Sequence, residues 1–272
     1  MKQLIIRDIF DNGFIGFAKD LKEKIMNKQF LKGLGYAVLM LIFPVISSVF
    51  IQMNNITDET MVLIIQAISF STATILGLIL MKINNYKLFA NKKINFKNVW
   101  WFSPLIVSEI PVLFLGISSD INLSYILVLL YFTIFVGISE EVFFRGLVLN
   151  TLLKNGGKYG VLVSSLMFGI LHLSNLAGGA SIKYVILQVI FAFLFGLVSA
   201  LLVVETKSLF PVIIWHFAHD FIAFITGDAM ILSSVSIIIL VFQCFVLLVY
   251  CISLWKKIKN STNTMEDRKF FN

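Results

Sequence analysis

Carboxylate, histidine and arginine side chains recur at one-turn spacing inside apolar stretches of this chain. Glu140 and Glu141 are adjacent, and Arg145 follows Glu141 by four residues. Four residues is the spacing of an ion pair within one helix. Glu140 then points to another face, about 100° around the helix axis, and stays free to take a proton from water. Glu140 is therefore the candidate general base, and Glu141 with Arg145 the candidate supporting pair.

Three histidines, His172, His216 and His219, also lie in apolar stretches. His172 follows Phe168 by one helical turn and could share a water molecule with Glu140. His216 and Asp220 are four residues apart and point the same way. They could bind a metal, position a water, or donate hydrogen bonds to an oxyanion if Asp220 is protonated. His219 lies on an adjacent face, where we expect a supporting or structural role.

The composition indicates a polytopic membrane protein. Hydrophobic residues make up 58% of the 272 residues and charged residues only 14%, whereas soluble domains have about 25% charged residues. The apolar residues form long blocks with short polar separators, which predicts an all-α membrane protein with about eight transmembrane helices. The expected spans are 33–52, 61–81, 99–117, 121–139, 159–176, 184–204, 209–226 and 230–254.

The basic residues predict the orientation of these spans. If both termini are cytoplasmic, 21 of the 22 Lys and Arg residues fall on the inner side and only Lys183 does not. This positive-inside bias explains the net charge of +7 better than a nucleic-acid partner does.

Cys244 and Cys251 are seven residues apart on one apolar helix, too far for a disulfide.

The chain divides into three parts. Residues 1–32 are too charged to span and suit a cytoplasmic segment that is amphipathic or frayed. Residues 33–254 form the transmembrane bundle, and residues 255–272 the cytoplasmic tail. Helical patterning continues from the fourth span to Leu153, and a turn is expected near Gly156. This hairpin brings Glu140 level with His172, each 16 residues from Gly156.

Two features leave the geometry open. Glu109 lies between Pro104 and Pro111 in the third span, where we expect a kink; it could line a cavity or satisfy the kinked backbone. His216 lies only about 10 Å from the inner end of its span, and Glu140 about 24 Å from its turn. A single site therefore requires the hairpin to project into the cytosol or the seventh helix to start deep in the bundle.

Three motifs in order carry a resemblance to a known family. Glu-Glu-x-x-x-Arg at Glu140–Arg145, Phe-x-x-x-His at Phe168–His172 and His-x-x-x-Asp at His216–Asp220 lie on separate spans. Together they resemble the CAAX-protease and bacteriocin-processing (CPBP) family of intramembrane endopeptidases, which includes the type II CAAX prenyl proteases. The similar region covers residues 121–226, the predicted protease-like core.

The resemblance implies hydrolysis of a peptide bond at or within the membrane. Glu140 would activate water with help from His172, and His216 with Asp220 would bind the oxyanion. Members have been described as metalloproteases, and a metal-free glutamate mechanism is also argued. Candidate ligands for a divalent metal such as zinc are Glu140, His172 and His216, with Asp220, and the sequence leaves both mechanisms open.

The expected substrate is a membrane-embedded peptide or protein, lipidated or not, in a bacterial plasma membrane. Bacterial relatives are linked to bacteriocin self-immunity and peptide maturation. Two alternatives stay open: a non-catalytic scaffold or immunity protein that binds a partner enzyme, and an ion-coupled transporter. The absence of an internal repeat counts against the transporter.

Overall fold

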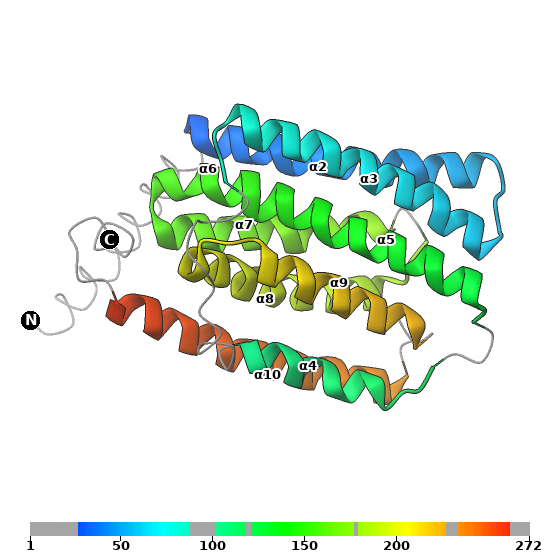
Figure 1. Ribbon diagram of the computed structural model, residues 1–272. Helices are drawn as coiled ribbons and strands as arrows, with labels where there is room; N and C mark the ends of the chain where they lie inside the picture. The colour runs from blue at the N-terminus through cyan, green and yellow to red at the C-terminus, as the bar shows by residue number, and fades with distance from the viewer. Residues whose placement is uncertain (1–26, 88–101, 118–120, 177–178, 227–232, 262–272) are drawn as a thin grey trace, which may run out of the picture.

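The computed structural model describes residues 27–87, 102–117, 121–176, 179–226 and 233–261, which form a bundle of helices (Figure 1). In chain order the elements are α2 (Lys28–Met53), α3 (Glu59–Ile83), α4 (Ser103–Leu113), α5 (Leu123–Glu141), the π-helix η2 (Val142–Leu149), α6 (Asn150–Leu152), the 3₁₀ turn η3 (Leu153–Asn155), α7 (Gly157–Leu171), the 3₁₀ turn η4 (His172–Leu176), α8 (Ile182–Thr206), α9 (Phe210–Ile225) and α10 (Ser234–Ser261). Most of the predicted segment 1–32 and of the tail 255–272 lies outside the described residues.

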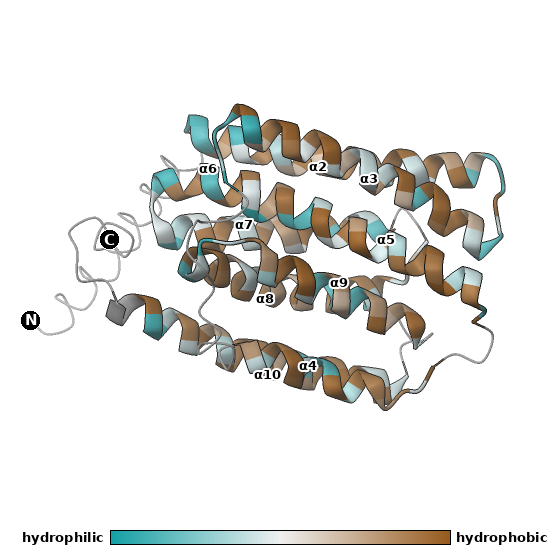
Figure 2. Ribbon diagram, viewed as in Figure 1, coloured by the Kyte–Doolittle hydropathy of each residue, from teal (hydrophilic) through white to brown (hydrophobic). Residues whose placement is uncertain are grey.

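The prediction of an all-α polytopic protein is confirmed. Within the described residues, six helical stretches are long and apolar enough to cross a membrane: Lys28–Met53, Glu59–Ile83, Leu123–Asn155, Gly157–Leu176, Ile182–Thr206 and Ser234–Ile258. Hydrophobic residues predominate along these helices (Figure 2), and large apolar side chains such as Ile68 and Ile75 on α3 are about three-fifths exposed. Exposed isoleucines at this density are expected of a surface in contact with lipid.

Two of the expected spans are shorter helices within the described residues. The expected spans 99–117 and 209–226 correspond to shorter apolar helices, Ser103–Leu113 and Phe210–Ile225. Pro104 lies in the first turn of α4, where proline starts a helix rather than kinking it. The short α9 likewise has a proline, Pro211, in its first turn. It begins three residues after Lys207, which ends α8 in the left-handed conformation.

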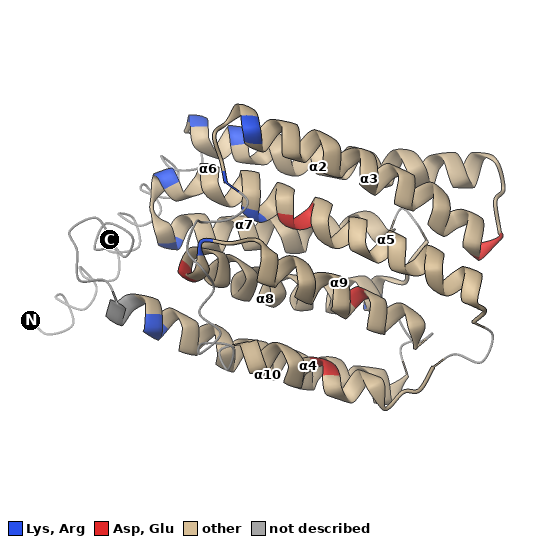
Figure 3. Ribbon diagram, viewed as in Figure 1, with Lys and Arg blue, Asp and Glu red and all other residues tan. Residues whose placement is uncertain are grey.

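Basic side chains gather at one end of the bundle, where α2 begins and α10 ends (Figure 3). The acidic residues Asp58 and Glu59 start α3 at the opposite end. This asymmetry agrees with the predicted orientation, in which the basic end faces the cytoplasm.

The predicted hairpin at Gly156 is present. Gly156 has a φ of +113°, a conformation that side chains disfavour, and it separates the Leu123–Asn155 stretch from α7. Phe144 and Phe168 each lie twelve residues from Gly156, and their ring centroids are 4.9 Å apart. The two arms of the hairpin are therefore level at this depth, as the spacing predicts.

The first arm of the hairpin departs from a regular α-helix. Its residues Val142–Leu149 form a π-helix, and all eight are buried. The side-chain amide of Asn150 donates hydrogen bonds to the carbonyls of Arg145 (3.0 Å) and Gly146 (2.9 Å) at the end of this segment. The predicted continuation of the helix to Leu153 is present, and the sequence did not predict its π-helical segment. π-helical turns are uncommon and are frequent at functional sites.

Helix α9 lies directly against the first arm because Gly137 leaves room for it. A β-carbon on Gly137 would lie 3.0 Å from the backbone nitrogen of Phe217. A β-carbon on Gly146 would clash with Met81 of α3, and Leu209, directly before α9, lies beside the same glycine at an ordinary contact distance of 3.5 Å. Since Leu209 is buried beside Gly146, α9 starts deep in the bundle. This placement brings His216 to the level of Glu140. Of the two arrangements that would allow a single site, it corresponds to the one in which the seventh helix starts deep in the bundle.

We expect Gly137→Ala to destabilise the fold. The added methyl group would meet the backbone of α9, and such overpacking costs about 1–3 kcal/mol. Gly35→Ala is the matched control, because a β-carbon there meets nothing within 4 Å. The free energy of unfolding of both variants in detergent, relative to the unmodified protein, checks the expectation. Equal stability of the two variants would contradict the close contact between α5 and α9.

Candidate active site

The two adjacent glutamates lie in different surroundings. Glu141 is completely buried, whereas the side chain of Glu140 is 18% exposed and that of Asp220, on α9, 21% exposed. The two accessible carboxylates can meet a substrate or a water, and the buried one cannot. This separation follows from the helix: neighbouring residues point about 100° apart.

His216 joins these carboxylates into one cluster. Its Nδ1 lies 2.9 Å from Oε1 of Glu141, so Nδ1–H donates a hydrogen bond to that carboxylate. Its Nε2 faces the accessible side, 3.7 Å from Oε2 of Glu140 and 3.6 Å from Oδ2 of Asp220. The structure therefore places His216 next to Glu140, and it contains the predicted pair of His216 and Asp220. The bond from His216 to Glu141 is a contact that the sequence analysis missed.

Arg145 lies beneath the cluster. Its guanidinium pairs with Oε1 of Glu141 at 3.1 Å, as the four-residue spacing predicts, and it lies over the ring of Phe168, 4.3 Å from the centroid. Arg145 is 1% exposed. A guanidinium this deep in an apolar bundle is stabilised by its carboxylate and by aromatic faces.

His172 reaches the cluster through Phe168. The Nδ1 of His172 lies 2.9 Å from the carbonyl oxygen of Phe168, and because a carbonyl only accepts, Nδ1 carries the proton. In the neutral ring Nε2 is then the free acceptor. The ring of Phe168 contacts both imidazoles edge-on, with centroids 5.0 Å from His172 and 6.0 Å from His216.

Gly169 allows the second arm to approach α8, as expected. A β-carbon there would lie 3.0 Å from the carbonyl oxygen of Val189. On the same helix pair, the side-chain amide of Asn175 donates to Gln188 at 2.7 Å. These contacts fix the segment that carries His172 against α8.

A second buried polar cluster adjoins the first. Glu109, which is 7% exposed, binds His219 through its Oε2 at 3.0 Å and Trp215 through its Oε1 at 3.1 Å. The sequence analysis expected structural roles for Glu109 and His219 but did not pair them. One signal in the sequence could have indicated this pairing: Glu109 and His219 both lie in apolar stretches, where an ionisable side chain needs a polar partner.

The candidate metal ligands are Glu140, His172 and His216, and a metal site requires their side chains to converge on one point. Among the residues that the structure describes, no group of three or more His, Cys, Asp or Glu side chains is arranged to hold a metal ion. The arrangement therefore does not support this ligand set, and we derive no step through a metal.

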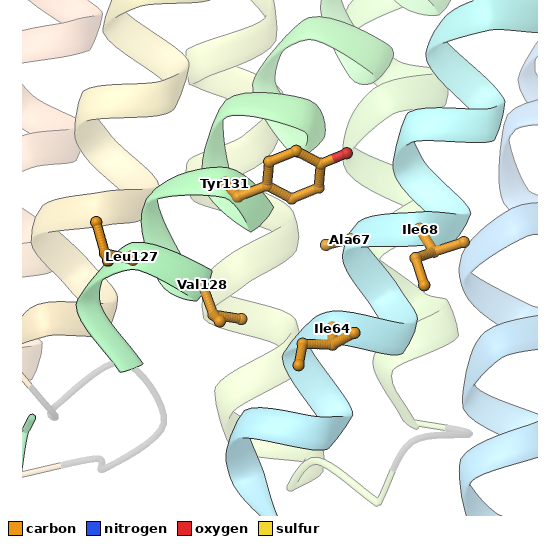
Figure 4. Close-up of a pocket in the computed structure, with 6 residues that line it drawn as sticks. All are labelled: Ile64, Ala67, Ile68, Leu127, Val128 and Tyr131. Carbon is orange, nitrogen blue, oxygen red and sulfur yellow. The ribbon is translucent and has the colours of Figure 1, made fainter. Parts of the chain in front are cut away.

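One surface hollow lies away from the cluster, between α3 and α5 (Figure 4). Its volume is about 220 Å³, and it is lined by six residues: Ile64, Ala67, Ile68, Leu127, Val128 and Tyr131. Apart from the hydroxyl of Tyr131, which lies 3.1 Å from Oγ of Ser71, this lining has no polar side-chain atom. It offers no group for catalysis.

The fold is that of a polytopic α-helical membrane protein, and Glu, His and Asp side chains meet inside its bundle. These residue types are typical of a membrane-embedded hydrolase. Residues 122–222 match the family model described as "Type II CAAX prenyl endopeptidase Rce1-like". Over these residues the chain is similar to this family of endopeptidases. No curated protein and no solved structure matches the chain.

The matched segment contains every residue of the three motifs. Glu109 lies outside it, on α4. The cluster around Glu109 therefore joins a residue outside the matched segment to Trp215 and His219 within it.

Proposed function

We propose that this protein is an intramembrane endopeptidase that hydrolyses a peptide bond in a membrane-associated peptide or a lipidated protein. The observation that carries the proposal is the position of His216, whose Nε2 faces both Glu140 and Asp220 while its Nδ1 is held by Glu141. A base, an oxyanion donor and a group that orients the donor are the parts that acyl-bond hydrolysis needs.

In this mechanism Glu140 takes a proton from a water molecule, and the water oxygen attacks the scissile carbonyl carbon. His172 assists, because its Nε2 is the nitrogen left free by the bond from Nδ1 to the Phe168 carbonyl. When the carbon–nitrogen bond breaks, the proton held by Glu140 passes to the departing amine. The products are a carboxylate and an amine.

His216 and Asp220 stabilise the negative charge that develops on the carbonyl oxygen. In its imidazolium form, with Nδ1–H bound to Glu141, His216 donates through Nε2–H, and a protonated Asp220 beside it is a second donor. Glu141 fixes the orientation of the imidazole, and Arg145 balances the charge of Glu141. The supporting pair thus holds the site without meeting the substrate.

We further propose that the transmembrane bundle is 33–254, with the protease-like core at 121–226, in a bacterial plasma membrane. A peptide precursor is the proposed substrate, with peptide maturation or bacteriocin self-immunity as the role. The apolar exterior of the bundle supports a substrate that reaches the site from the membrane.

We expect the purified protein, reconstituted in liposomes, to cleave a membrane-anchored peptide in ¹⁸O-labelled water and to place ¹⁸O in the new carboxyl terminus. Mass spectrometry of the products measures this. The same assay after exhaustive chelation, with metal analysis of the protein, distinguishes a metal-dependent site from a water-only one. If no peptide from a broad anchored library is cut while the protein is folded, the proposed activity is wrong.

A further inference from the structure

The buried carboxylate of Glu109 is held by donors from three helices. Oε1 accepts from the indole N–H of Trp215 on α9 (3.1 Å) and lies 3.0 Å from the hydroxyl of Ser108 on α4. Oε2 accepts from Nδ1 of His219 on α9 (3.0 Å) and from the amide of Gln243 on α10 (3.4 Å). Both oxygens are therefore satisfied inside the bundle, and α4, α9 and α10 are joined at one point.

The α9 residues at this point alternate with the residues of the candidate active site. Trp215 and His219 are four apart and face Glu109, whereas His216 and Asp220 are four apart and face Glu140. The two pairs are offset by one residue, about 100° around one helix. The rotation of α9 that satisfies Glu109 is thus the rotation that presents His216 and Asp220 to Glu140.

Aromatic side chains of α8 support the same arrangement. Phe195 stacks on Trp215 with ring centroids 3.9 Å apart and contacts the ring of His216 at 4.9 Å. Phe191 stacks on His219 at 4.8 Å. Helix α9 is thus held by α8 and by α5, and the carboxylate of Glu109 adds polar contacts from α4 to Trp215 and His219.

We propose that Glu109 is a positioning residue for the reaction. It fixes the rotation of α9 and so places His216 and Asp220 opposite Glu140. The effect on catalysis rests on the proposed function, whereas the effect on the geometry of His216 does not. Glu109 does not lie in the segment that matches the family model, so nothing in that match assigns it a role.

The test uses the three histidines of the full-length protein, labelled with ¹⁵N and assigned with His-to-Asn variants. In Glu109→Leu we expect the ¹⁵N signal of His219 Nδ1 to change because its partner is removed. We also expect the signal of His216 Nδ1 to change, because a rotation of α9 would alter its hydrogen bond to Glu141. We expect kcat to fall by on the order of 10²-fold with KM little changed, since a displacement of about 1 Å can have this effect. Glu109→Gln keeps an acceptor for Trp215 and should recover part of both effects.

Val112→Ala is the matched control, because it truncates a buried residue of the same helix outside the polar cluster. It should lower stability without moving the His216 signal. If Glu109→Leu does not fold, Trp215→Phe replaces it, since this change removes the indole N–H and keeps the aromatic stacking. A His216 signal and kcat unchanged relative to Val112→Ala would overturn the proposal. If the unmodified protein cleaves nothing, the proposed function fails, and the ¹⁵N signals alone still decide the positioning role.

Discussion

Glu140→Gln is expected to reduce peptide cleavage by about 10²- to 10⁴-fold, the usual contribution of a general base. The amide keeps the size of the side chain but cannot take a proton from water. Little change in stability is expected, because the Glu140 side chain is partly exposed and its contact with His216 is 3.7 Å long. The rate of product formation by reconstituted protein measures the effect, with thermal unfolding as the check on folding.

Asp220→Asn is the matched control for this change. It makes the same carboxylate-to-amide replacement 3.6 Å from the same nitrogen of His216. An amide can still donate a hydrogen bond to an oxyanion, so we expect a loss of at most about tenfold, well below the 10²- to 10³-fold effect of removing an oxyanion donor. If Glu140→Gln is as active as Asp220→Asn, Glu140 is not the base.

Arg145→Leu is expected to lower the free energy of unfolding by about 3–5 kcal/mol, because it leaves Glu141 charged, buried and without its cation. Glu141 is completely buried, and Arg145 lies 3.1 Å from it. The pair of Lys257 and Glu205, 2.9 Å apart with side chains 28% and 26% exposed, gives the control. Lys257→Leu should cost no more than about 1 kcal/mol. Unfolding in detergent, followed by tryptophan fluorescence, measures both.

The double variant Glu141→Leu with Arg145→Leu tests the cause. If an unpaired carboxylate destabilises Arg145→Leu, removing that carboxylate should restore much of the stability, since an apolar pair of similar volume often replaces a buried ion pair without loss. A double variant less stable than Arg145→Leu would show that the guanidinium acts mainly through its packing on Phe168.

Features encoded by local patterns could be predicted from the sequence. Apolar blocks placed the helices, glycines placed the turn at Gly156, and four-residue spacing placed the pairs Glu141 with Arg145 and His216 with Asp220. These predictions hold because spacing along one helix determines which side chains share a face.

Contacts between helices could not be predicted in the same way. The bond from His216 to Glu141 and the pairing of Glu109 with His219 join residues 75 and 110 positions apart. No local spacing encodes them; they depend on the depth at which α9 begins. The π-helix at Val142–Leu149 could not be predicted from the sequence either. An apolar stretch is compatible with an α-helix or a π-helix, and packing around the segment decides between them.

One oxygen atom of Glu141 serves two neighbours. Oε1 is 3.1 Å from the Arg145 guanidinium and 2.9 Å from Nδ1 of His216. The buried cation and the imidazole that faces Glu140 therefore share one acceptor atom. A substitution that changes the contact of Glu141 with one of these neighbours is expected to change its contact with the other.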